Sequence, residues 1–193
     1  ISAGSTDSQE KRDQIPVIEQ NGIRLALLAY SYGFNGYRVP EDKPYLANEF
    51  SYEQAEQDIQ KAKEVADVIV VSMHWGTEYQ DTPNETQLEQ AKWLADQGVN
   101  VILGEHPHVL QPVDILVGRD GNETLVAYSL GNFISGQTGL AKLVGGILKF
   151  DIIKTTIGDE VKIEISQPQL MPTYNYAENG TVNYQVVPLV ESD

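Results

Sequence analysis

The spacing of apolar residues predicts alternating strands and helices along the first two thirds of the chain. Residues 15–19 and 23–30 are largely aliphatic and flank an Asn-Gly pair, a pattern typical of a tight β-hairpin. From Tyr52 to Ala66 the apolar positions recur every three or four residues, which predicts an amphipathic helix. Ser51, with a glutamine three residues later, is typical of a helix N-terminus.

A second set of elements follows with short links. Residues 68–73 (VIVVSM) are almost continuously apolar, as in a strand that is buried on both faces. Residues 84–97 predict a second helix that ends before a glycine, and residues 99–103 and 125–130 predict two more buried strands. The order β-α-β-α-β indicates an α/β fold that contains parallel strands.

The pattern changes after residue 136. Residues 145–154, 161–171 and 182–188 predict antiparallel strands, which we expect to be added to the sheet as C-terminal hairpins. We therefore expect a single α/β domain over residues 15–193. Residues 1–14 are polar and charged, and we expect them to form a mobile start.

The composition narrows the range of functions. The 193 residues carry 13 Lys and Arg against 28 Asp and Glu, and this net charge of −15 argues against nucleic-acid binding, which depends on a basic surface. The absence of cysteine excludes a disulfide scaffold, a thiol nucleophile and a cysteine-ligated metal. No run approaches the roughly 18 apolar residues that a membrane-spanning helix needs.

The three histidines follow strands of the predicted parallel sheet. His74 comes directly after the strand 68–73, and His106 and His108 come after the strand 99–103. Because ligands collect beyond the carboxyl ends of parallel strands, we expect the three imidazoles at one edge of the sheet. We expect the bend after the strand to turn both side chains of the His-x-His segment toward one point.

These residue types suit a metal centre. Neutral imidazole binds zinc, iron, nickel or copper, and the oxygens of Glu78, Glu105 and Asn132 admit manganese or a second metal, or orient an imidazole. Each residue also has a plainer interpretation. A lone histidine such as His74 is often a hydrogen-bonded core residue, the glutamates are solvated carboxylates, and Asn132 is a turn residue. The His-x-His pair favours the metal, since two packed imidazoles must both find partners.

The segment 31–50 predicts a long loop, because it has two glycines, two prolines and no clean period. Its tyrosines, with those that flank it, allow two interpretations. They form a lid or a rim that contacts a carbohydrate or peptide, or they hold the loop against the protein surface.

Four segments resemble one known family. Residues 74–79 (HWGTEY), 87–94, 104–112 (GEHPHVLQP) and 128–133 (YSLGNF) are similar, in sequence and in spacing, to the CapA family of bacterial capsule-synthesis proteins. This family is linked to poly-γ-glutamate production and falls within the calcineurin-like metallophosphatase superfamily. The likeness extends from about residue 15 to residue 153.

The resemblance implies a four-layer α/β/β/α sandwich with a two-metal site between its sheets, and this chain would form part of it. It implies that His74, His106 and His108 are metal ligands, with Mn, Zn or Fe as the divalent ions. Glu78 and Asn132 match family motif positions and are the expected catalytic residues. Glu105 stands where relatives often carry another histidine.

The chain departs from the family pattern at its start. Relatives begin with a segment that carries Gly-Asp and Asn-His motifs, which supply further ligands, and this chain does not begin with either. It therefore resembles the latter part of a family member, and we expect half of a two-metal site to hold metal weakly or not at all. Three alternatives follow: a fragment of a longer protein, a missing half supplied by another chain, or a family member that is not a metallohydrolase.

The resemblance implies two functions. In the first, the chain belongs to a metal-dependent hydrolase of calcineurin-like type. In the second, it is a non-catalytic surface or assembly factor for the synthesis or export of poly-γ-glutamate. Both imply other capsule-synthesis components and the anionic polymer as partners. Both also imply an extracytoplasmic location, with membrane association through a segment outside this chain.

Overall fold

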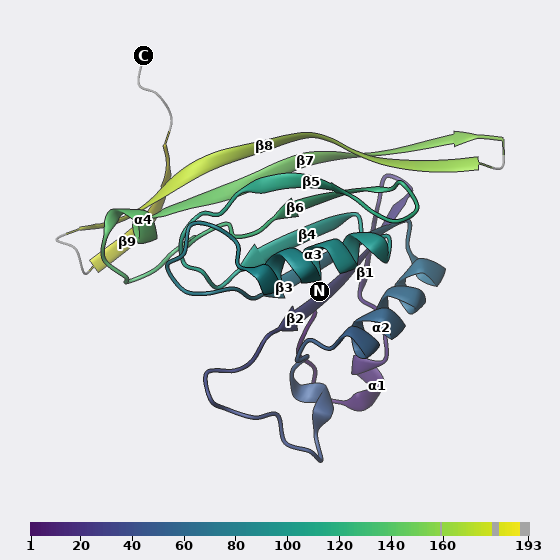
Figure 1. Cartoon of the computed structure of the whole chain (residues 1–193), viewed down its shortest axis with the longest axis horizontal. Coiled ribbons are helices and arrows are strands. Elements are labelled where there is room, and N and C mark those ends of the chain that lie inside the picture. The colour runs from purple at the N-terminus through teal and green to yellow at the C-terminus, as the bar shows by residue number, and fades with distance from the viewer. Residues whose placement is uncertain (159, 179–181, 190–193) are drawn as a thin grey trace.

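The computed structural model of the chain describes residues 1–158, 160–178 and 182–189 (Figure 1). Its larger sheet has six strands in the order β1-β2-β3-β4-β6-β5. These strands are β1 (Val17–Gln20), β2 (Ile23–Ser31), β3 (Val68–His74), β4 (Val101–Glu105), β5 (Val113–Val117) and β6 (Glu123–Ala127). The four central strands run parallel, and β1 and β5 are antiparallel edge strands. The predicted α/β class is therefore confirmed.

The two long helices begin close to where the sequence predicted, and the two short helices were not predicted. The helices are α1 (Gln9–Arg12), α2 (Tyr52–Val65), α3 (Glu85–Asp96) and α4 (Leu140–Leu143), with a 3-10 turn, η1 (Pro44–Leu46). Ser51 Oγ accepts a hydrogen bond from the Gln54 backbone N–H (3.2 Å) at the start of α2. At the start of α3, Asn84 and Gln87 form a complete capping box, in which each side chain bonds the other residue's backbone N–H.

The C-terminal strands form a sheet of their own, which corrects our expectation of hairpins added to the first sheet. This sheet has the order β7-β8-β9 and contains β7 (Val144–Ile157), β8 (Glu160–Glu178) and β9 (Val182–Pro188). Side chains on alternate positions of β7 and β8, including Leu148, Phe150 and Ile165, pack on the face of the larger sheet. Stacking buries these apolar residues, whereas edge-on addition would leave them exposed.

Other elements cover both faces of the parallel strands, with the helices on one side and β7 and β8 on the other (Figure 1), and apolar residues pack at both faces. On one face, α2 and α3 pack against side chains such as Ile69, Val71 and Ile102. On the other face, Val68, Val70 and Val101 meet the β7–β8 strands. The described residues thus form α, β and β layers, which agrees with part of the α/β/β/α sandwich that the family resemblance implied. None of the helices in the described ranges is long and apolar enough to cross a membrane.

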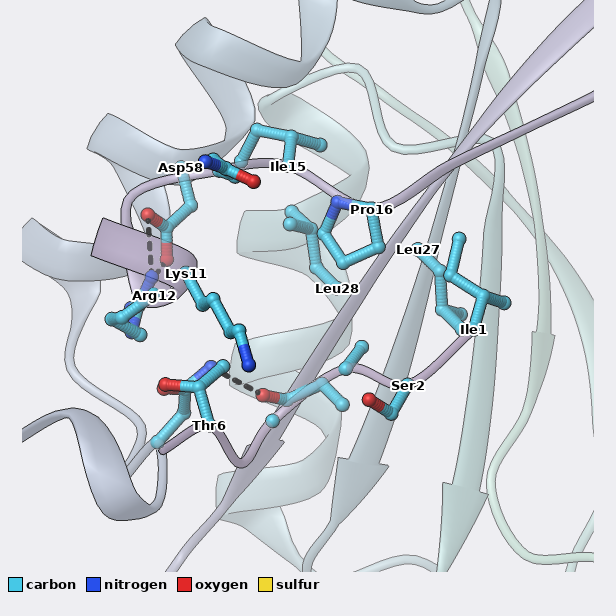
Figure 2. Close-up of a pocket in the computed structure, with 15 residues that line it drawn as sticks. Ile1, Ser2, Thr6, Lys11, Arg12, Ile15, Pro16, Leu27, Leu28 and Asp58 are labelled. Atoms are coloured by element: carbon cyan, nitrogen blue, oxygen red, sulfur yellow. Dashed lines mark hydrogen bonds and ion pairs between the residues drawn. The ribbon is translucent and has the colours of Figure 1, made fainter. Parts of the chain in front are cut away.

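Residues 1–14 are polar, as expected, but they contain α1 and line a pocket of about 280 Å³ (Figure 2). Arg12 donates to both carboxylate oxygens of Asp58 on α2, at 3.2 and 2.8 Å. Asp58 is 1% exposed and also accepts from the Tyr30 hydroxyl (2.9 Å) and from Gln54 Nε2 (3.1 Å). This segment is therefore tied to the helix layer by a buried ion pair. Its expected mobility stays a prediction.

Candidate metal centre

The three imidazole rings lie together at the carboxyl edge of the parallel strands. His74 is the last residue of β3, and His106 and His108 lie in the loop that follows β4. The ring centroids of His74 and His106 are 4.5 Å apart, and those of His106 and His108 are 6.0 Å apart. The parallel strand order brings these residues to one edge, as the sequence pattern predicted.

The backbone after β4 turns so that both later histidines reach the same region. His106 has a φ of 100° and His108 a φ of 61°, values that residues other than glycine rarely adopt. In a continued strand the two rings would lie on one face of the sheet, because residues i and i+2 share a face, whereas here both residues leave the extended conformation. Between them, the Pro107 carbonyl accepts a hydrogen bond from the Tyr79 backbone N–H (2.8 Å), which links the two loops of the site.

Glu78, His106 and His108 form a group of donor atoms that fits a divalent cation. One ligand atom from each residue lies within 4.8 Å of the others, and Glu78 Oε1 is 3.9 Å from His108 Nε2. Two ligands that bind one ion at about 2.1 Å are at most about 4.2 Å apart, so small side-chain adjustments close this group around a metal. A carboxylate with two imidazoles is a donor set for zinc, iron or manganese.

His74 lies beside this group rather than within it. Its ring faces the ring of Tyr32 at 5.9 Å, with an angle of 1° between the planes, and both rings border His106, at 4.5 Å from His74 and 4.9 Å from Tyr32. Burial lowers the pKa of His106, and the neighbouring His74 lowers it further, against the opposing effect of Glu78. A neutral imidazole keeps the lone pair that a metal ligand needs.

Asn132 fixes the tautomer of His108. Its Nδ2 donates to the Lys142 carbonyl (3.0 Å) and to Gln137 Oε1 (3.1 Å), so its Oδ1 is the atom that faces His108 Nδ1 at 2.9 Å. An amide oxygen only accepts, and His108 Nδ1 must therefore carry the hydrogen. In the neutral ring this leaves the lone pair on Nε2, the atom 3.9 Å from Glu78 Oε1, where it can bind a metal.

Buried contacts hold the HWGTE segment in place beneath the site. Trp75 is 1% exposed, and its Nε1–H donates to the Tyr128 carbonyl (2.9 Å). Gly76 has a φ of 87°, and a Cβ at this position would lie 2.6 Å from the side chain of Gln87. Gln87 is buried and belongs to the α3 capping box. The loop that carries Glu78 is therefore packed against the start of α3.

Two residues at the rim of the donor group, Tyr79 and Lys142, were not among the predicted site residues. The Tyr79 ring stacks on His108 at 5.9 Å, and Lys142 Nζ lies 4.7 Å from the centre of the Tyr79 ring. The position of Tyr79 directly after Glu78 was a usable signal, whereas Lys142 lies in the short α4 outside any motif. In the aromatic loop, Tyr32 reaches the histidines, while Tyr37 is 82% exposed.

Sequence comparison identifies relatives with a stated role. The profile described as "Bacterial capsule synthesis protein PGA_cap" matches residues 1–137. The chain is 30% identical over 195 residues to the PGA biosynthesis protein CapA of Bacillus subtilis (strain 168), which covers 98% of this chain and 42% of that protein. It is also 30% identical over 173 residues to the capsule biosynthesis protein CapA of Bacillus anthracis, which covers 88% of this chain and 35% of that protein.

Solved structures give weaker likenesses. A putative 5'-nucleotidase from Staphylococcus aureus matches 93% of this chain and 30% of its own, with 15% identity and a TM-score of 0.46. The NAD nucleotidase of Haemophilus influenzae matches 91% of this chain and 34% of its own, with 11% identity and a TM-score of 0.48. Likenesses at this level say nothing about the chemistry of the chain.

The profile match covers most of the chain, including the segments that carry His74, Glu78, His106, His108 and Asn132. The chain spans less than half the length of the two CapA proteins. The 30% sequence identity to both proteins confirms the CapA resemblance seen in the motifs. The roles of the individual site residues stay predictions. The chain belongs to the bacterial capsule synthesis protein family PGA_cap.

Proposed function

We propose that this chain carries a divalent-metal site that serves capsule synthesis, with Glu78, His106 and His108 as ligands. The observation that carries the proposal is the convergence of these three donor atoms within 4.8 Å. His74 extends the group at the side of His106, as a ligand for a second ion or as a contact for the bound substrate. Asn132 orients His108 rather than binding the metal itself.

A divalent ion bound here would act as a Lewis acid and activate water for hydrolysis. The residues of the chain prepare the site for that role. Asn132 places the hydrogen of the neutral His108 ring on Nδ1 and so leaves Nε2 as the nitrogen that can bind a metal, and burial lowers the pKa of His106, which favours its neutral imidazole. Glu78 is half exposed and supplies negative charge at the open side of the site, where it offsets the charge of the cation.

The wider role is proposed from the family. We infer that the substrate or product of the complete protein is poly-γ-glutamate, and that other capsule-synthesis components are its partners. This role favours an extracytoplasmic location, with membrane association through a segment outside this chain. The net charge of −15 opposes direct contact with a polyanion, so a bound cation would help the polymer to approach.

The metal site is tested by titrating the chain with Zn²⁺ and Mn²⁺ in a calorimeter. We expect H106A and E78Q to weaken binding by about tenfold or more, because H106A removes one ligand and E78Q replaces a charged carboxylate ligand with a neutral amide. E105Q is the matched control for E78Q, since Glu105 is an exposed carboxylate at the end of β4 and lies outside the donor group. Equal affinities for E78Q and E105Q, or no binding by the unmodified chain, would contradict the proposed site.

The reaction is tested separately from the metal. We expect metal-dependent hydrolysis of a generic phosphodiester if the site supports catalysis, and its loss in H106A. Metal binding without turnover would favour the non-catalytic assembly role instead. The same assay on the full-length B. subtilis relative, which is more than twice as long as this chain, compares the chain with a longer family member.

A further inference from the structure

Lys142 is held beside the histidines by two independent routes. Along the first, its carbonyl accepts a hydrogen bond from Asn132 Nδ2 (3.0 Å), and Asn132 Oδ1 faces His108 Nδ1 (2.9 Å). Along the second, its Nζ lies 4.7 Å from the centre of the Tyr79 ring, which stacks on His108. Both the backbone and the charged end of Lys142 are therefore positioned relative to the same imidazole.

Gln137 closes this network. Its Oε1 accepts from Asn132 Nδ2 (3.1 Å), and its Nε2 donates to the Tyr79 hydroxyl (3.4 Å). Tyr79 itself has a φ of 66°, an uncommon backbone conformation for a residue with a side chain, and its backbone N–H bonds the Pro107 carbonyl (2.8 Å). The ring on which Lys142 rests is therefore fixed at both its backbone and its hydroxyl.

The charge of Lys142 contrasts with its surroundings. The chain carries a net charge of −15, and the donor group at this edge includes the carboxylate of Glu78. Four of the nine lysines pair with a carboxylate among the described residues, as Lys154 pairs with Asp67 at 3.0 Å. The Lys142 ammonium instead lies over the face of Tyr79, an arrangement that stabilises a cation and leaves its hydrogens able to bond an anion.

We propose that Lys142, positioned by Tyr79, recognises an oxyanion of the substrate beside the metal centre. This inference rests on the proposed function for the identity of the site, and it adds the chemical class of the group that is bound. The oxyanion is a carboxylate of a γ-linked glutamate chain or a phosphate, since both offer oxygens to an ammonium group. Lys142 is the specificity-determining residue, and Tyr79 is its positioning residue.

The test compares K142M with K142R and with K61M. K61M removes the same charge from an exposed position on α2, in the helix layer. Calorimetry measures the affinity of each variant for a short γ-linked glutamate peptide and for inorganic phosphate, with and without Mn²⁺. We expect K142M to weaken binding of the peptide by about fivefold, while K142R stays within about twofold of the unmodified chain and K61M equals it.

A second variant tests the positioning role. Y79A removes the ring under Lys142, whereas Y79F keeps the ring and removes only the hydroxyl. We expect Y79A to weaken peptide binding nearly as much as K142M, and Y79F to retain most of the affinity, because the cation contacts the ring face. Circular dichroism of each variant shows whether it has kept its fold.

The outcomes separate this inference from the proposed function. A K142M protein that loses affinity for phosphate but not for the peptide would identify phosphate as the bound group. If the unmodified chain binds the peptide but no Mn²⁺, and K142M binds the peptide more weakly, the proposed metal site is wrong and the role of Lys142 is supported. If K142M binds both probes as tightly as K61M, or the unmodified chain binds neither, the role of Lys142 is wrong.

Discussion

The buried ion pair between Arg12 and Asp58 predicts a large loss of stability in R12M. This change removes two hydrogen bonds, at 3.2 and 2.8 Å, from a carboxylate whose side chain is 1% exposed. Burial alone would lower the pKa of Arg12, but the hydrogen bonds and charge of Asp58 outweigh it and raise that pKa. The guanidinium is therefore stabilised by the carboxylate it contacts.

The size of the stability loss in R12M depends on the hydrogen bonds that Asp58 keeps. Removing one partner of a buried pair costs about 3–5 kcal/mol, because the other charge is left uncompensated. In R12M, Asp58 would still accept from the Tyr30 hydroxyl (2.9 Å) and from Gln54 Nε2 (3.1 Å). The Arg12 side chain is also 13% exposed, so water replaces part of its contact. We therefore expect a loss of about 3 kcal/mol, at the lower end of that range.

Urea unfolding followed by tryptophan fluorescence measures this loss, since Trp75 is buried in the core. K11M is the matched control, because Lys11 pairs with Asp7 at the surface, where both side chains are more than half exposed. R12M/D58L should recover part of the stability, since it removes the uncompensated carboxylate as well. An R12M protein as stable as K11M would refute the reasoning, and so would a double variant no more stable than R12M.

Three further changes have defined outcomes. N132A should weaken Zn²⁺ binding by about tenfold in calorimetry, because the tautomer of His108 is no longer fixed. G104A should lower the free energy of unfolding by about 2 kcal/mol or more, since a Cβ there would lie 2.1 Å from the Tyr128 carbonyl oxygen. D67N should have a lower free energy of unfolding than the unmodified chain at neutral pH, but not in acid. The backbone N–H of Arg24 and nearby cations lower the pKa of Asp67, so its contribution is present above the unfolded pKa of about 3.9 and lost as the pH falls through the lower folded value.

Each of these has an outcome that would contradict it. The first is wrong if N132A and the unmodified chain bind Zn²⁺ equally. The second is compared with G33A, since a Cβ at Gly33 meets nothing within 4 Å, and equal urea midpoints for the two variants would contradict it. For the third, a stability difference between D67N and the unmodified chain that stays constant from neutral pH to about pH 3 would be inconsistent with a lowered pKa.

The parallel core was predictable because local signals agreed with the fold. The continuous apolar run 68–73 became the central strand β3, and the helix-period segment that starts at Tyr52 became α2. The edge strand β5 was not predicted. Its residues Val113–Val117 are half-buried or exposed, so they carry neither the continuous apolar run nor the clean alternation that identifies a strand. The strand patterns also missed the separate second sheet, because they do not specify which sheet a hairpin joins, and only the family resemblance implied two sheets.

The candidate site was partly predictable for a related reason. The carboxyl ends of parallel strands meet at one edge, so the placement of His74, His106 and His108 followed from the strand order. The position of Lys142 did not follow from the strand order, because Lys142 comes from the short helix α4 that precedes β7. Its contact with Tyr79 is long-range in sequence, and no local pattern encodes it.

The left-handed backbone conformation of His106 and His108 lowers the free energy of unfolding of the protein. Left-handed conformations of residues other than glycine cost on the order of 1–3 kcal/mol each, and φ values of 100° and 61° place both residues there. A glycine at either position would relax the chain while it removes an imidazole. Selection for robustness alone would thus tend to erase the histidines, and a lineage freed from the need for this site should drift toward glycine at both positions.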